Sequence, residues 1–229
     1  MPSTSPPTLL FLLREDLDVV VSQDPSVTSR WEALGHSGLS AVWAHRVAHR
    51  LYLGGLPTTA RSLARLSRRR TGVEIHPGAV LGRRVFIDHG AAVVVGQTAT
   101  VGDDVTIYQQ VTLGAVGWWS DNARPVGERR HPAVGSGVIL GANATVLGPV
   151  TIGDGALIGA MATVTEDIAP GARVYAPRSV VRDAPLSAVA GGTGDPRGAA
   201  GGIPGGVPAP PEAVTALDPV RLLASAGSW

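Results

Sequence analysis

The chain lacks cysteine and lysine altogether, and aromatic residues are scarce. Without Cys among its 229 residues, it can form neither disulfides nor thiolate metal sites, and it has no cysteine nucleophile. All 19 cationic residues are Arg, which excludes a Schiff-base lysine and the lysine of a P-loop. Because only 4% of the residues are aromatic, the core must be built from Val, Ile, Leu and Ala.

Charge and hydropathy exclude further classes. A formal net charge of +1 gives no global reason to expect a nucleic-acid partner. The 30 Gly and 18 Pro residues argue against an all-helical bundle. The apolar run Leu9–Leu13 is too short for a signal peptide, and no longer run approaches a membrane span. We therefore expect a cytoplasmic protein that binds neither nucleic acid nor membranes.

Residues 1–71 carry the apolar spacing of helices, with repeats at three and four positions. Asp24-Pro25 ends the first expected helix, and Gly54-Gly55 ends the second. A third, short helix ends at Arg68-Arg69-Arg70, where basic residues suit the negative end of the helix dipole. The pattern predicts an N-terminal helical region.

At Gly72 the pattern changes to a six-residue repeat. Each repeat has an aliphatic residue, usually a small residue directly after it, and a small or branched residue four positions further on. The aliphatic positions are Ile75, Leu81, Ile87, Val95, Val101, Ile107 and Leu113, and after an interruption Val134, Leu140, Val146, Ile152, Ile158 and Val164. The positions four further on are Ala79, Val85, Ala91, Ala99, Val105, Val111, Val138, Ala144, Val150, Ala156 and Ala162.

Such a repeat favours short strands separated by turns, stacked into a prism with one aliphatic residue per face pointing inward. A narrow bore also explains the scarcity of aromatic residues. The pattern resembles the hexapeptide-repeat acyltransferases, which implies a left-handed parallel β-helix, usually trimeric with active sites between subunits. We expect an α+β fold with three parts: the helical region 1–71, a β-helix acyltransferase domain over 72–183, and a disordered Gly/Ala/Pro-rich tail over 184–229.

Two of the six histidines are candidates for catalysis. His89 follows Asp88 near an expected corner of the prism, and His131 ends the interruption of the repeat. Histidine can take a proton from a hydroxyl, and a carboxylate on its other ring nitrogen orients it. Glu74, one coil away from His89 by the repeat count, could supply that carboxylate.

Several motifs extend the resemblance to one family, the serine O-acetyltransferases. The similar motifs are Gly72–Pro77 (GVEIHP), Asp88-His89, Gly96–Ala99 (GQTA), Val111–Gly114 (VTLG), Arg130–Pro132 (RHP), and in the helices Asp24-Pro25 and Arg46–His49. The resemblance implies that His89 is the general base on the serine hydroxyl, oriented by Glu74. It implies that Arg130 binds the acceptor carboxylate through its planar guanidinium. The other residues implied to line the acceptor site are Asp24, Asp88 and His131.

The same resemblance implies acetyl-CoA as co-substrate and no metal. Acetyl-CoA would lie in the groove between subunits, near Ala115, Ala142 and Ala160, and would be held mainly through backbone groups. Direct transfer in a ternary complex fits a chain without Cys and Lys. The backbone N–H groups around Gly114 and Ala115 are the candidates for binding the thioester oxyanion.

The chain departs from the family pattern around this expected site. Glu74 replaces an Asp, and Gln97 replaces a Glu. The short glycine-rich loop has become Val116–Glu128, in which Trp118-Trp119 either packs against the neighbouring coil or roofs a different pocket. The family's interaction with cysteine synthase uses a C-terminal Ile, whereas this chain ends in Trp229, which argues against that partner.

The sequence leaves four functions to weigh. The first is O-acetylation of L-serine for cysteine biosynthesis, by a homotrimer or a dimer of trimers. The second is the same chemistry on another hydroxy- or amino-bearing amino acid. A hexapeptide-repeat carbonic anhydrase would need three histidines on Zn²⁺, but the His-x4-His spacing is missing and His45-x3-His49 lacks a metalloprotease Glu. A non-catalytic scaffold is disfavoured by the intact pairs Asp88-His89 and Arg130-His131.

Overall fold

The computed structural model of the chain describes residues 7–121, 123–125 and 127–177. These belong to the first of two units into which the chain divides, 1–179. The expected tail 184–229 lies outside the described residues, as do the expected domain end at 183 and Trp229.

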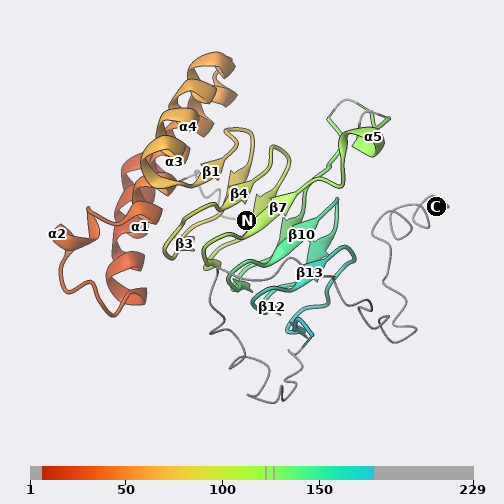
Figure 1. The fold of residues 1–229 in the computed structure, drawn as a ribbon. Coiled ribbons are helices and arrows are strands. Elements are labelled where there is room, and N and C mark those ends of the chain that lie inside the picture. The colour runs from red at the N-terminus through yellow and green to blue at the C-terminus, as the bar shows by residue number, and fades with distance from the viewer. Residues whose placement is uncertain (1–6, 122, 126, 178–229) are drawn as a thin grey trace, which may run out of the picture. The chain divides into compact units, whose positions relative to one another are not determined.

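The helical region contains the three expected helices and one short addition. The helices are α1 (Leu9–Gln23), α2 (Arg30–Ala33), α3 (Ser37–Leu53) and α4 (Pro57–Thr71). Thr8 caps α1 by accepting a hydrogen bond from the backbone N–H of Phe11. Gly72 ends α4 in the left-handed conformation, with φ of 73°. Figure 1 shows α1, α3 and α4 packed together beside the first coils. None of the helices in the described ranges has both the length and the apolar character of a membrane span.

From Glu74 onward the chain forms a left-handed parallel β-helix, as expected. The first sheet contains β1 (Glu74–Ile75), β4 (Val94–Val95), β7 (Thr112–Gly114), β10 (Thr145–Leu147) and β13 (Thr163–Val164). The second contains β2 (Val80–Leu81), β5 (Thr100–Val101), β8 (Ala133–Val134) and β11 (Thr151–Ile152). The third contains β3 (Phe86–Ile87), β6 (Thr106–Ile107), β9 (Ile139–Leu140), β12 (Leu157–Ile158) and β14 (Arg173–Val174).

Each coil contributes one strand to each sheet, so the chain turns three corners per coil. We name the two that matter here by the sheets they join. The third-to-first corner includes the turn from β3 to β4, and the first-to-second corner includes the turn from β4 to β5. The short helix α5 (Trp118–Asp121) lies in the interruption between β7 and β8, at the first-to-second corner.

The repeat prediction identifies the core correctly, with one error. Every aliphatic repeat position from Ile75 to Val164 is buried. Ala91, expected inside, is exposed, and Val93 is fully buried in its place. The reason is that Ile87 and Val95 stand eight positions apart rather than six, so this corner is two residues longer than those below it.

A buried ion pair joins the helical region to the coils. Arg46 of α3 forms a two-bond fork with the carboxylate of Asp16 in α1, at 2.9 and 3.2 Å. The same guanidinium donates to the carbonyl oxygens of Leu81 and Gly82, at 2.9 and 2.7 Å. Side-chain exposure is 5% for Arg46 and 1% for Asp16. Both helices are thereby fixed to the turn that follows β2.

His45, beside this pair on α3, predicts a dependence of stability on pH. Burial lowers the pKa of His45 to about 3, with His49 and Arg46 adding to the effect. Below about pH 6.5 an unfolded His takes up a proton, which folded His45 does not. The free energy of unfolding should therefore fall as pH drops from 6.5 toward 4, with His45 contributing up to about 1.4 kcal/mol per pH unit. Urea unfolding across this range should show a shallower decline for His45→Gln than for wild type, and equal slopes would contradict the prediction.

Candidate functional site

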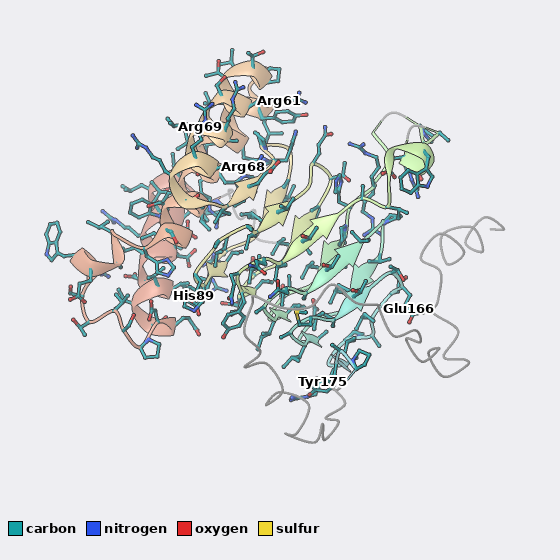
Figure 2. The ribbon with its side chains drawn as sticks, viewed as in Figure 1. Arg61, Arg68, Arg69, His89, Glu166 and Tyr175 are labelled. Atoms are coloured by element: carbon teal, nitrogen blue, oxygen red, sulfur yellow. The ribbon has the colours of Figure 1, made fainter. Side chains whose placement is uncertain are left out.

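The longer turn from β3 to β4 presents Asp88 and His89. His89 has a left-handed backbone, with φ of 58°, and the N–H of Gly90 donates to the carbonyl of Asp88 at 2.6 Å. The His89 side chain is 69% exposed, and its Nε2 lies 3.7 Å from Oδ2 of Asp88. Figure 2 shows His89 at the edge of the coils, next to the helical region. The inserted residues thus turn a histidine outward at a corner.

The beginning of α3 fixes this turn. The hydroxyl of Ser37 donates to the carbonyl oxygen of His89 at 3.2 Å. Gly38 lies so close to β3 that a Cβ there would be 2.0 Å from the carbonyl oxygen of Ile87. This close approach requires glycine and seats the helix directly on the strand that leads into the site.

Asp24 and His36 complete the group around His89. Oδ1 of Asp24 accepts bonds from the hydroxyl and the backbone N–H of Ser26, which lower the pKa of this carboxyl. Nδ1 of His36 accepts from the N–H of Leu39, so in the neutral ring Nε2 carries the proton, 3.8 Å from Oδ2 of Asp24. Burial lowers the pKa of His36, and the charges of Asp24 and Asp88 oppose this.

The structure thus brings together three of the predicted site residues, Asp24, Asp88 and His89. It adds His36, which sequence reasoning missed. His36 directly precedes α3 and stacks on Phe86, with ring centroids 5.7 Å apart. His36 lies outside the six-residue repeat, so the repeat gave no reason to place it in the site. A histidine directly before an expected helix is equally consistent with a helix N-cap.

Glu74 has a different partner in this chain. Its Oε2 lies 2.9 Å from Nη1 of Arg68, at the end of α4. Across the described residues, no hydrogen bond or ion pair joins Glu74 to His89. The orienting role of Glu74 therefore stays a prediction.

Arg130 and His131 lie in a second group, at the first-to-second corner. The hydroxyl oxygen of Thr98 accepts from the backbone N–H groups of both residues, at 2.9 and 3.1 Å. The N–H of Thr98 donates to Nδ1 of His131 at 3.2 Å. Burial lowers the pKa of His131, and the neighbouring Arg130 lowers it further. Nη2 of Arg130 donates to Oε1 of Gln97 at 2.9 Å, so the side-chain amide of Gln97 holds the guanidinium.

Gly96 leaves the space that the His131 ring fills. A Cβ at position 96 would lie 1.9 Å from Cδ2 of His131, so Gly96→Ala must displace the imidazole. If His131 acts in the reaction, kcat/KM should fall by about 100-fold, the order of loss expected when a reacting group shifts by about 1 Å. Steady-state kinetics would measure this loss.

The control for this prediction is a double variant. Adding Gly96→Ala to His131→Ala should cause little further loss, because the displaced ring is already absent. Independent, multiplicative losses from the two substitutions would contradict an effect through His131.

The helix α5 lies in the loop that leads to Arg130 and His131. Asp121 is buried, and its Oδ1 lies 3.4 Å from Nε of Arg124. The charge of Asp121 partly opposes the lowering of the His131 pKa. The Trp119 ring packs on Gly117 of its own loop, where a Cβ would lie 2.4 Å from Cη2, and the residue is 55% exposed. The side chain of Trp118 lies outside what the structure describes.

The alanines expected near acetyl-CoA divide between the same two corners. Ala142 follows β9 and Ala160 follows β12, both at the third-to-first corner. The two are stacked, because the N–H of Met161 donates to the carbonyl of Ala142 at 2.9 Å. Ala115 follows β7 at the first-to-second corner.

One chain therefore presents two groups, at opposite ends of the strands of the first sheet. The first corner group is Asp24, His36, Asp88, His89, Ala142 and Ala160. The second corner group is Gln97, Thr98, Ala115, Arg130 and His131. The first holds two carboxylates, the exposed imidazole of His89 and the largely buried imidazole of His36, and the second holds a guanidinium and the buried imidazole of His131. In the described parts of the chain, no cluster of three or more His, Asp and Glu residues is arranged to hold a metal ion.

Comparison with known proteins places this geometry in context. The family model described as bacterial transferase hexapeptide (six repeats) matches residues 131–166. A serine acetyltransferase of Mycobacterium tuberculosis is 46% identical over 167 residues, which cover 72% of this chain and 70% of the relative. A serine acetyltransferase of Bacillus subtilis is 46% identical over 158 residues, 69% of this chain and 70% of the relative.

Solved structures agree with these sequence matches. The Neisseria gonorrhoeae serine acetyltransferase in complex with serine is similar, with a TM-score of 0.67 and 36% identity over 74% of this chain and 67% of that chain. The Brucella abortus serine acetyltransferase in complex with coenzyme A has a TM-score of 0.66 and 34% identity over 72% of this chain and 64% of that chain.

Proposed function

The chain belongs to the serine acetyltransferase family, and from that premise we propose that it transfers the acetyl group of acetyl-CoA to the hydroxyl of L-serine, forming O-acetyl-L-serine. The observation that carries the proposal is the division of the site residues between two corners of one chain. A cyclic trimer has heterologous interfaces, in which one surface of a subunit meets a different surface of its neighbour. In a homotrimer, the first corner group of one copy would face the second corner group of the next.

Each group has the chemistry for one part of an amino-acid acceptor. The carboxylates of Asp24 and Asp88 suit the ammonium group of serine, and the low pKa of Asp24 keeps it charged. Arg130, held in place by Gln97, suits the acceptor carboxylate through paired N–H donors. The acceptor would thus bridge two subunits, with its hydroxyl between His89 and His131.

His89 then acts first as a base and afterwards as an acid. Its imidazole takes the proton of the serine hydroxyl as the oxygen bonds to the thioester carbonyl carbon. When the carbon–sulfur bond breaks, the imidazolium returns this proton to the leaving sulfur, so the histidine ends as it began. In this proposal, backbone N–H groups near Gly114 and Ala115 bind the oxyanion. His131 stays largely neutral, because burial and Arg130 lower its pKa.

The coil corners fit the co-substrate. Acetyl-CoA supplies the acetyl group as an activated thioester. Small residues let successive coils stack closely at the third-to-first corner, since a Cβ on Gly141 would lie 2.6 Å from the backbone nitrogen of Ala160. A long, thin ligand could lie along this strip, with Ala115 of the next copy opposite. A cytoplasmic location, where acetyl-CoA is made and used, is part of the same proposal.

An acceptor screen tests the proposal. The purified protein is supplied with acetyl-CoA and either L-serine, L-homoserine or L-threonine, and the free thiol of CoA is followed. The highest kcat/KM is expected with L-serine. Turnover of another acceptor without turnover of L-serine would favour the same chemistry on a different amino acid, and no thiol release with any acceptor would refute the proposal.

A further inference from the structure

A pocket lined by several charged residues lies between α4 and the first coil. It has a volume of about 520 Å³. Helix α4 supplies most of its wall, and the coil supplies the residues that follow Gly72. The lining includes Arg61, Ser62, Arg65, Arg68, Glu74 and His76.

The charge of this pocket is poorly balanced. Arg68 is paired with Glu74, at 2.9 Å. Among the residues that the structure describes, no carboxylate is paired with Arg61 or Arg65. Helix α4 contains no acidic residue at all, and its arginines lie at three- and four-residue spacings, where like charges repel. Figure 2 shows Arg61, Arg68 and Arg69 along this helix.

The pocket has the chemistry of a site for an anion with an organic part. Arg61 and Arg65 are one helical turn apart, so two guanidinium forks can converge on one group, and Ser62 adds a hydroxyl donor. Guanidinium forks match the oxygen atoms of phosphate. Ala64 of α4 and the buried Ile75 and Pro77 of the coil add apolar atoms to the lining. Burial lowers the pKa of His76, and the positive charge of Arg61 lowers it further.

We infer that this pocket binds a phosphate group, either free phosphate or the phosphate of a small monoester, as a site separate from the acetyl-transfer site. Arg61 and Arg65 bind the phosphate oxygens, and the apolar part of the lining receives the organic part. Arg68 stays paired with Glu74. This inference does not require the proposed reaction, because it concerns binding in the absence of both substrates.

The test is calorimetric titration of the full-length protein with inorganic phosphate and with phenyl phosphate, in a phosphate-free buffer at constant ionic strength. Three proteins are compared: wild type, Arg61→Gln/Arg65→Gln, and the control Arg69→Gln/Arg70→Gln. The control removes two arginines of the same helix that do not line this pocket. Saturable binding to wild type and control is expected, with at least ten-fold weaker binding to the pocket variant. Tighter binding of phenyl phosphate than of phosphate would identify a monoester site, and equal binding would identify a free-phosphate site.

Several results would overturn the inference. One is the absence of saturable binding to wild type, and another is equal affinity in the pocket variant and the control. A ten-fold rise in KM for acetyl-CoA in the pocket variant alone would make the pocket part of the co-substrate site. Loss of the native oligomer in that variant alone, measured by light scattering, would instead make it an interface between copies.

Discussion

Replacement of His89 by Ala is expected to lower kcat for thiol release from acetyl-CoA and L-serine by about 10²–10⁴-fold, the usual contribution of a general base. His89 is the exposed imidazole of the first corner group, beside Asp88. Because its side chain makes no core contact, the variant should keep the oligomeric state and the thermal stability of wild type. Thiol-release assays measure kcat. Light scattering and thermal unfolding of the same preparations measure the oligomeric state and the stability.

His49→Gln is the matched control for this result. His49 lies in α3, and its Nδ1 is bonded to the carbonyl of Pro77, which belongs to neither corner group. Its kcat should stay within a few-fold of wild type. Activity of His89→Ala within two-fold of the control would remove His89 from the mechanism.

Replacement of Arg46 by Met is expected to lower the free energy of unfolding by about 3–5 kcal/mol, the usual effect of removing one partner of a buried ion pair. The change leaves the Asp16 carboxylate buried without its cation, and leaves the carbonyls of Leu81 and Gly82 without their donor. Urea unfolding at one fixed protein concentration measures the loss.

Two further variants separate the charge effect from lost packing. Arg30→Met breaks the exposed pair with Asp18, where solvent screens the charges, and should change stability little. Adding Asp16→Leu to Arg46→Met removes the stranded charge and should recover a large part of the loss. A double variant less stable than Arg46→Met alone would contradict the account of this pair.

The core could be predicted from the sequence because a β-helix repeats the same local rule in every coil. An aliphatic residue at each repeat position is buried wherever the count of six holds. The rule failed at Ala91, because two extra residues follow Ile87 and shift the inward position to Val93. The same insertion exposes the His89 side chain at the corner. The irregularity that made the prediction wrong at Ala91 is therefore part of the candidate site.

The site was predicted less completely because its geometry is not local. Motif resemblance identified Asp24, Asp88 and His89, which the structure brings together from α1's end and the third-to-first corner. It could not identify His36, whose place beside Asp24 depends on how α3 seats on β3. Nor could spacing reveal the ion pair between Glu74 and Arg68, since that contact depends on the angle between α4 and the first coil.

We propose a shared active site in the trimer, which combines His89 of one subunit with His131 of the next. Complementation tests it most directly: the inactive variants His89→Ala and His131→Ala are unfolded together, refolded as a mixture and assayed. Random mixing in a cyclic trimer restores one complete site in every mixed assembly, so activity should return to about a quarter of wild type. If the refolded mixture is no more active than the two variants refolded separately, while mixed assemblies are present, both histidines belong to a site within one chain and the account is wrong.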